Sequence, residues 1–345
     1  MEVIITGAPS SGKSTFLNAL TGEKGQFTDK TNIGNVLIPD ERIDYLVTIF
    51  KPKKTSYANL TFFDTPASIN IKKKGSFAIE LANSIKTSDL ITTIISTYDL
   101  ADENTLDLAL EKIASNESEL IFYDLAIIEK RLEAFKKEKV HPSEKALLEK
   151  FHNTLVEEIP LRTLVLSDED KGFISKYSFF SLKPIIYLVN RSENSEAILN
   201  NAKITAFSNK NKAPIYDSPF NIEEEICGLE KNEKLDFLKE YGMENSIKEA
   251  FLKKVFETLD LISFLTVGEQ EVRAWPVKRN ISAHKAAGKI HSDIERGFIK
   301  AETIAYDEFL NHNDLVKAKN AGKLRLEGKE YIVKDGDIIT FMFNV

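Results

Sequence analysis

The sequence predicts an α/β fold for most of the chain and a smaller α+β module at its C-terminal end. Three observations support this. Short apolar runs rich in β-branched residues alternate with helix-favouring stretches up to about residue 260. A glycine-bearing loop separates the first apolar run from the first such stretch. A charge-rich, glycine-free segment at residues 102–158 interrupts the alternation.

The loop at residues 7–15 fits the pattern G-x-x-x-x-G-K-S/T and lies between a strand-like run at 2–6 and a helix-like run at 14–20. In this pattern the glycines allow a tight turn whose backbone N–H groups face phosphate oxygens. The sequence therefore predicts a bound nucleoside triphosphate. Lys13 would reach its terminal phosphates and act in catalysis, and Ser14 would ligate Mg²⁺. The predicted phosphate contacts are Pro9, Ser10, Ser11, Gly12, Lys13, Ser14 and Thr15.

Composition and charge limit the partners and the cellular compartment that we expect for the protein. The net charge of −7 requires any nucleic-acid contact to come from a local basic patch. A single cysteine, Cys227, excludes an intrachain disulfide framework and fits a reducing compartment. No apolar run is long enough to span a bilayer, and the first strand begins almost at Met1. We therefore expect a cytoplasmic protein without a membrane partner.

Two further segments point to the metal. The polar stretch at 21–35 lies where nucleotide switches place a threonine that completes Mg²⁺ coordination, and Thr28 and Thr31 are the alternatives. The apolar run at 59–63 ends at Asp64, the position of a Mg²⁺-holding aspartate. Where related switches carry a water-orienting glutamine this chain has Ser68, so the sequence indicates no general base.

Later parts of the chain predict further strands at 89–96, 183–189 and 212–216. The segment 102–158 has apolar side chains at helical spacing and predicts an antiparallel helical arm inserted in the nucleotide domain. Residues 233–259 read as helical. A packed surface bundle and a docking arm are equally compatible with the inserted segment.

The strand at 183–189 leads into Asn190, Arg191 and Glu193, where GTPases carry N-K-x-D to hold guanine. Replacing the aspartate by Glu193 and the lysine by Arg191 would spoil a pocket optimised for guanine. Asn190 and Glu193 are thus predicted base contacts in a pocket that disfavours guanine.

The tail from about residue 261 predicts a hairpin at 268–277, a helix at 282–290 and strands at 330–333 and 338–343. Basic residues beside Trp275 and Phe298 give it a surface that could meet RNA, although a solvated charged face is equally compatible. These basic residues are Arg273, Lys278, Arg279, His284, Lys285, Lys289, Arg296 and Lys300.

With these motifs in place, the chain resembles the Obg-like ATPases, the YchF group within the Obg family of P-loop proteins. The tail carries the strongest likeness, because five of its stretches read like that group's TGS domain. These stretches are 271–275, 285–288, 290–291, 297–302 and 335–337. Asn190 and Glu193 match the group's N-x-x-E motif. Thr28, with Asn32, Gly34, Pro39 and Asp40, matches its first switch, which favours Thr28 over Thr31.

The resemblance implies a P-loop NTPase fold (G-domain-like) with an inserted helical coiled-coil arm and a C-terminal β-grasp TGS domain. The expected bounds are 1–100 and 161–260 for the nucleotide-binding domain, 101–160 for the arm and 261–345 for the tail. Members are slow nucleotide hydrolases associated with ribosomes and with translation or stress control. Ribosome or RNA contact is then expected through the TGS domain and the arm.

This chain departs from the group's pattern at three places. Ser10 replaces an asparagine of the phosphate loop, residues 64–75 lose most of the glycines of the second switch, and an S-A-K-like loop is replaced around residues 216–218. We therefore interpret the sequence as a diverged member. The leading hypothesis is a Mg²⁺-dependent, slow ATPase. The alternatives are a GTPase that tolerates Glu193 and a non-catalytic ribosome- or RNA-binding module with nucleotide as a structural ligand.

Overall fold

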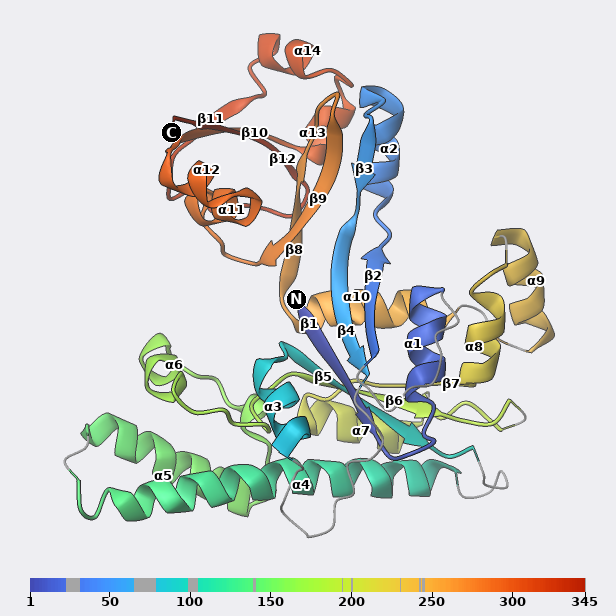
Figure 1. Cartoon of the computed structure of the whole chain (residues 1–345), viewed down its shortest axis with the longest axis vertical. Helices are drawn as coiled ribbons and strands as arrows, with labels where there is room; N and C mark the ends of the chain where they lie inside the picture. The colour runs from blue at the N-terminus through green and yellow to red at the C-terminus, as the bar shows by residue number, and fades with distance from the viewer. Residues whose placement is uncertain are drawn as a thin grey trace. The chain divides into compact units, whose positions relative to one another are not determined.

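A computed structural model describes residues 1–22, 32–64, 79–98, 105–138, 141–193, 195–199, 201–229, 231–241, 243 and 246–344. The chain divides into two compact units. One comprises residues 1–35 and 61–251, and the other comprises residues 36–60 and 252–345. We describe each unit separately (Figure 1).

The first unit is built on a six-stranded sheet in the order β2-β4-β1-β5-β6-β7. β1 pairs in parallel with β4 and β5, and β6 lies parallel between β5 and β7. Their carboxyl ends therefore share one edge, where open α/β sheets bind ligands. The strands are β1 (Glu2–Gly7), β2 (Asn32–Ile38), β4 (Ala58–Asp64), β5 (Leu90–Ser96), β6 (Ile185–Asn190) and β7 (Ile215–Ser218).

Helices cover this sheet because its central strands are buried on both faces and need apolar partners. On one face, side chains from α3, α4 and α7 share a core with the central strands, and this core includes Ile91 and Tyr187. Around α1, Phe16 stacks on Phe220 and meets Phe251 edge to face. The helices are α1 (Lys13–Thr21), α3 (Ile79–Thr87), α7 (Ala202–Asn211), α8 (Phe220–Ile226) and α9 (Lys231–Glu240). Helix α10 (Ile247–Thr258) begins in this unit and continues past its last residue, Phe251. None of the helices in the described ranges is long and apolar enough to cross a membrane.

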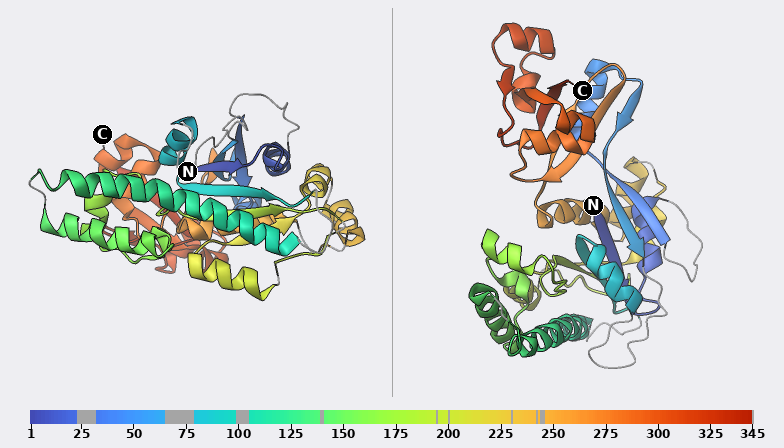
Figure 2. Two further views of the ribbon diagram at one scale, coloured as in Figure 1. Left: turned by 90° about the horizontal axis from the view of Figure 1, so that it is seen from below. Right: turned by 60° about the vertical axis from the view of Figure 1, so that its left-hand side comes forward.

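The inserted segment forms two long helices, α4 (Thr105–Ala134) and α5 (Pro142–Val156), that lie side by side (Figure 2). Beyond the sheet they share an apolar cluster, which includes Ile128 and Phe151, with the segment that follows them. That segment contains a short 3₁₀ turn, η2 (Leu161–Thr163), and helix α6 (Asp168–Ile174). The predicted helical content of 102–158 is thus confirmed, with a break between the two helices.

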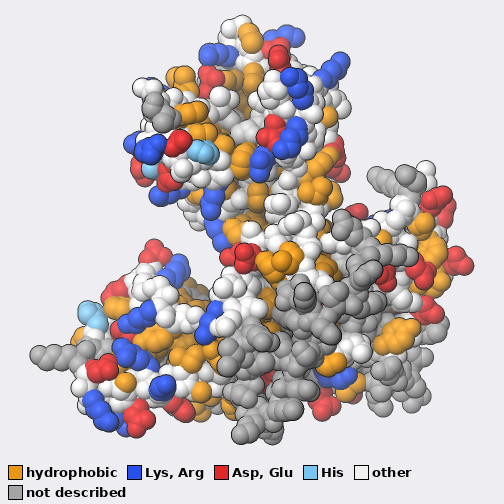
Figure 3. Space-filling model, viewed as in Figure 1, with side chains coloured by type: hydrophobic (Ala, Val, Ile, Leu, Met, Phe, Trp, Pro, Cys, Tyr) orange, Lys and Arg blue, Asp and Glu red, His pale blue; other side chains and the backbone are white. Residues whose placement is uncertain are grey.

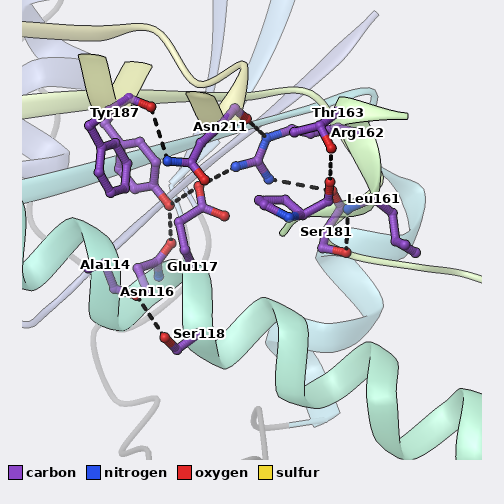
Figure 4. A network of polar contacts seen from close by, with 12 residues as sticks. Ala114, Asn116, Glu117, Ser118, Leu161, Arg162, Thr163, Ser181, Tyr187 and Asn211 are labelled. Atoms are coloured by element: carbon purple, nitrogen blue, oxygen red, sulfur yellow. Dashed lines mark hydrogen bonds and ion pairs between the residues drawn. The ribbon is translucent and has the colours of Figure 1, made fainter. Parts of the chain in front are cut away.

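A buried polar network connects α4 to the sheet (Figure 4). Glu117 of α4 pairs with Arg162, and both side chains are about 5% exposed (6% and 5%). The Tyr187 hydroxyl of β6 donates to Glu117 Oε1 at 2.9 Å, and Arg162 Nε donates to the Asn211 carbonyl at 2.9 Å. Each buried charge therefore faces an opposite charge, as a buried ion pair requires, while Glu117 Oε2 has no hydrogen-bond partner within the described residues. The network holds α4, at Glu117, against β6, the strand that ends at Asn190.

The second unit contains a mixed six-stranded sheet in the order β11-β10-β12-β8-β9-β3. β8 and β9 form an antiparallel hairpin, and β12 lies parallel to β8 and antiparallel to β10. The strands are β3 (Lys54–Ser56), β8 (Leu261–Thr266), β9 (Glu271–Lys278), β10 (Phe298–Ala305), β11 (Arg325–Glu327) and β12 (Asp337–Phe343). The helices are α2 (Glu41–Phe50), α11 (Ala283–Ile290), α12 (Ser292–Arg296), α13 (Tyr306–Leu310) and α14 (Leu315–Asn320).

Residues 36–60 differ from their expected place in the first part of the nucleotide domain, because they group with the C-terminal segment. β3 adds a parallel edge strand beside β9, with Lys54 opposite Glu271. Ile43 and Leu46 of α2 are buried in a core with Leu265 and Ile338. The domain bounds given above otherwise stay a prediction.

One local prediction in the C-terminal segment was wrong. Residues 330–333 form no ladder: only Ile332 makes an isolated bridge, to Ser282. The Asp337 carboxylate accepts hydrogen bonds from the Tyr331 hydroxyl and the Lys334 N–H, both within 2.9 Å. These bonds bend residues 331–334 away from an extended strand. The stretch 233–259, predicted to be helical, contains two helices, α9 and α10, so that this prediction is confirmed.

Candidate functional site

The loop between β1 and α1 turns on two glycines with positive φ, Gly7 at 143° and Gly12 at 99°. A Cβ at Gly7 would lie 2.5 Å from the Ile94 carbonyl oxygen, and a Cβ at Gly12 would lie 2.5 Å from Asn190 Nδ2. Both positions therefore lack room for a side chain. The loop leads directly into the N-terminus of α1, where unpaired N–H groups and the helix dipole favour an anion.

Lys13, the first residue of α1, folds back over this loop. Its Nζ donates to the carbonyl oxygens of Gly7 and Ala8, at 3.1 Å and 3.0 Å. Burial lowers the pKa of Lys13 below its ordinary value, and the Asp64 carboxylate partly opposes that shift. The ammonium group is thus held at the place where a phosphate chain would lie on the loop.

Ser14 and Asp64 meet at the carboxyl end of β4. Ser14 Oγ donates to Asp64 Oδ2 at 2.7 Å, and Asn32 Nδ2 approaches the same oxygen at 3.4 Å. Asp64 is only 4% exposed, and its other oxygen, Oδ1, is buried without a hydrogen-bond partner in the described part of the chain. An unpartnered buried carboxylate oxygen is costly. Together with a serine hydroxyl it forms the all-oxygen donor set that Mg²⁺ prefers.

Asn190, the last residue of β6, connects three segments. Its Nδ2 donates to the Ser11 carbonyl at 3.1 Å, and its Oδ1 accepts from the Phe220 N–H at 3.2 Å. Its own carbonyl accepts from the Thr97 N–H at 2.9 Å. The side chain is therefore committed to the phosphate loop and to the start of α8. In this state Asn190 positions the loop.

Glu193 lies three residues further on and is exposed. Its Oε2 accepts a hydrogen bond from Asn221 Nδ2 at 3.1 Å. Arg191 turns inward instead and pairs with Asp217 at 2.8 Å. The structure thus separates the two substitutions seen in the sequence: Glu193 faces solvent, while Arg191 is used inside the protein.

The remaining predicted residues fall in two groups. Pro9 and Ser10 are exposed at the tip of the phosphate loop, and Thr15 is half-buried in α1. Ser10 has φ of 59°, a left-handed conformation that asparagine adopts more readily than serine. Thr28, its alternative Thr31 and the second switch after Asp64 lie outside the described residues.

Comparisons with known proteins agree with this geometry. A family model described as a 50S ribosome-binding GTPase matches residues 2–124. The model for the C-terminal part of YchF GTPases, described as a protein of unknown function, matches residues 261–344. A protein of Bacillus subtilis (strain 168) named "Ribosome-binding ATPase YchF" is 35% identical over 362 residues, covering 99% of this chain and 98% of the relative. Another of that name, from Escherichia coli O157:H7, is 33% identical with the same coverage.

The chain belongs to the YchF family. A solved structure described as that of the Schizosaccharomyces pombe YchF GTPase aligns with a TM-score of 0.83 at 26% identity, and covers 99% of this chain and 97% of that one. A GTP binding protein from Pyrococcus horikoshii OT3 shares the fold, with a TM-score of 0.58 at 17% identity. The P-loop α/β fold class predicted from the sequence is therefore confirmed, and a C-terminal domain is present.

Sequence reasoning missed two residues beside the base motif, Asp217 and Asn221. Asp217 occupies the place where an S-A-K-like loop was expected, and its carboxylate binds the Arg191 side chain. Arg191 and Asp217 belong to separate motifs of the sequence. Their pairing follows from the β6–β7 register, in which Val189 lies opposite Asp217. The available signal was that Arg191 replaces the lysine of the GTPase N-K-x-D motif and that Asp217 lies where the S-A-K-like loop is replaced.

The basic tail surface predicted above is largely neutralised. Acidic neighbours pair with five of its eight side chains, and the distances run from 2.6 to 4.0 Å. Lys278 donates to the Leu259 carbonyl instead. On the face of the second unit seen in Figure 3, basic and acidic side chains are intermixed. Lys289 and Lys300 are exposed and have no ion-pair partner among the described residues.

The contact of Gly12 with Asn190 leads to a prediction. Gly12→Ala should weaken ATP binding by about tenfold or more, because the new Cβ must displace the Asn190 amide and thereby the phosphate loop. Gly172→Ala in α6, where a Cβ meets nothing within 4 Å, is the matched control. Calorimetric titration of folded protein measures both. Equal affinity of Gly12→Ala and the native chain would contradict this account of the loop.

Proposed function

We propose that this chain is a magnesium-dependent nucleotide hydrolase that takes ATP ahead of GTP and acts in association with the ribosome. One observation carries the catalytic part: Lys13, Ser14 and Asp64 converge beside the phosphate loop, and Asp64 retains a buried oxygen without a partner. The names of the relatives, ribosome-binding ATPases, support the rest.

We infer a distinct task for each of these residues. The backbone N–H groups of residues 10–15 would bind the β- and γ-phosphate oxygens, and Lys13 would exchange its carbonyl contacts for them. Ser14 and Asp64, with Thr28 from the first switch, would hold the metal ion. Bound Mg²⁺ supplies charge neutralisation at the transferring phosphate. Most of the rate enhancement would thus come from preorganised positive charge in a buried site.

For the base we propose Asn190 and Glu193, with Asn190 acting chiefly by holding the phosphate loop. GTP hydrolysis is the second candidate activity. It is favoured by the likeness to a structure described as a YchF GTPase.

The domain organisation expected from the family is part of the same proposal. In the tail, strands β8 and β12 form a parallel central pair, and α11 packs on one face of the sheet. This arrangement supports a β-grasp TGS domain. The side-by-side helices α4 and α5 support an inserted coiled-coil arm. We propose that the tail and the arm contact the ribosome or its RNA.

Hydrolysis is tested by steady-state phosphate release from ATP with Mg²⁺. Lys13→Ala should lower turnover by about 100-fold, because it removes a preorganised cation from the transferring phosphate. Lys210→Ala, on the exposed side of α7, is the matched control and should leave turnover unchanged. Turnover by Lys13→Ala at the native rate would exclude this site as the source of activity. Absence of turnover in the native chain would favour the non-catalytic alternative.

Ribosome association is tested by co-sedimentation of the full chain with purified ribosomes at increasing salt. Lys289→Glu combined with Lys300→Glu should reduce binding by about tenfold and flatten its salt dependence, because each lysine would neutralise a phosphate. Lys210→Glu is the control. Unchanged binding of the double variant would exclude this face of the tail, and failure of the native chain to sediment would exclude the ribosome as partner.

A further inference from the structure

We propose that Arg191 and Asp217 are a positioning pair that fixes the described residues of the loop after β6, 191–193 and 195–199, and that this pair sets the affinity and selectivity for the base. The inference rests on the proposed function, because it concerns how the same nucleotide site holds the nucleoside. Neither residue would touch the nucleotide. Both would act through Glu193, which the loop carries.

Arg191 fastens the start of the loop. Its Nε donates to Asp217 Oδ2 at 2.8 Å, and its Nη1 donates to the carbonyl oxygens of Ser192 and Ser195, at 3.1 Å and 2.7 Å. The side chain is only 10% exposed. The rigid fork of a guanidinium group can hold these acceptors at the same time, which a lysine ammonium on a flexible stem does less well. Arg191 therefore holds the backbone of Ser192 and Ser195 in place.

Asp217 fastens the other end of the loop. Its Oδ1 accepts from the Leu199 N–H at 3.0 Å, and its Oδ2 accepts from the Ile198 N–H at 3.4 Å as well as from Arg191. The side chain is 2% exposed. Because Asp217 belongs to β7, one carboxylate connects both ends of the loop to the rigid sheet.

Glu193 lies within this fastened loop and is also held from outside. Asn221, at the start of α8, donates its Nδ2 to Glu193 Oε2 at 3.1 Å. The other oxygen, Oε1, accepts no hydrogen bond within the described residues. An oriented carboxylate with one available oxygen can accept an N–H from the exocyclic amine of a base. Fixing the loop thus fixes an acceptor for the base edge.

The pair also determines the charge near the base. A basic residue at position 191 would flank the base if its side chain faced outward. Here Asp217 balances the guanidinium charge and draws it inside. The electrostatic character of the base edge is then left to Glu193.

A purely structural ion pair would stabilise the fold without affecting base recognition, so the test separates these roles. Arg191→Lys keeps the positive charge but loses the guanidinium fork, whereas Asp217→Asn keeps the side-chain size but removes the counter-ion of Arg191. Asp260→Asn, which loosens the exposed pair with Arg279 in the second unit, is the matched control. Calorimetry with Mg²⁺ measures the affinity of each protein for ATP, GTP and inorganic tripolyphosphate.

We expect both variants to bind ATP about tenfold more weakly, or about 1.4 kcal/mol, with the ATP-to-GTP affinity ratio moved toward one. Affinity for tripolyphosphate, which has no base, should stay as in the native chain. The Asp260→Asn control should match the native chain for all three ligands.

The proposal is overturned if the variants keep the native ATP affinity and ATP-to-GTP ratio, or if they lose tripolyphosphate as strongly as ATP. If Asp217→Asn does not fold, Arg191→Lys decides by the same criteria. Lys13→Ala distinguishes the proposed function from this inference. Unchanged binding of ATP and tripolyphosphate by that variant would contradict the phosphate site itself, whatever the positioning pair does.

Discussion

The site depends on one side chain, the Asn190 amide, which connects the phosphate loop to the rest of the sheet. It donates to the Ser11 carbonyl and accepts from the Phe220 N–H, while its main chain holds Thr97. Such an amide uses donor and acceptor in opposite directions, so it fixes two loops relative to each other. The close approach leaves no room for a Cβ at Gly12. A single hydrogen-bonded residue thereby joins the phosphate loop to the segments for which we propose base binding.

Near Asn190, the buried charged side chains each have a partner close by. Lys13 rests on backbone carbonyl oxygens near Asp64, and the Asp64 carboxylate takes a hydrogen bond from Ser14 while keeping one oxygen unpartnered. Arg191 is matched by Asp217 in the same way. Buried charges are tolerated only with such partners, and an incompletely satisfied carboxylate favours a cation. The arrangement of charges thus favours a triphosphate with its metal ion.

The site's local elements could be predicted from the sequence, whereas its long-range pairs could not. Residues 7–15 and Asp64 were recognisable because turn, strand end and helix start are encoded over a few positions. The Arg191–Asp217 pair depends on the β6–β7 register, which spacing alone does not reveal. The grouping of residues 36–60 with the tail depends on β3 pairing with β9, far along the chain. The run at 330–333 has strand-like composition, but the Asp337 carboxylate bends it.

Calorimetric titration of the nucleotide-free native chain with ATP and with GTP, each with Mg²⁺, tests the central claim most directly. The account predicts that ATP binds at least about tenfold more tightly, a difference of about 1.4 kcal/mol. A preference for GTP would contradict the assignment of Glu193 to an adenine-accepting site. Binding of neither nucleotide would contradict the proposal that the loop at Lys13 is a working phosphate site.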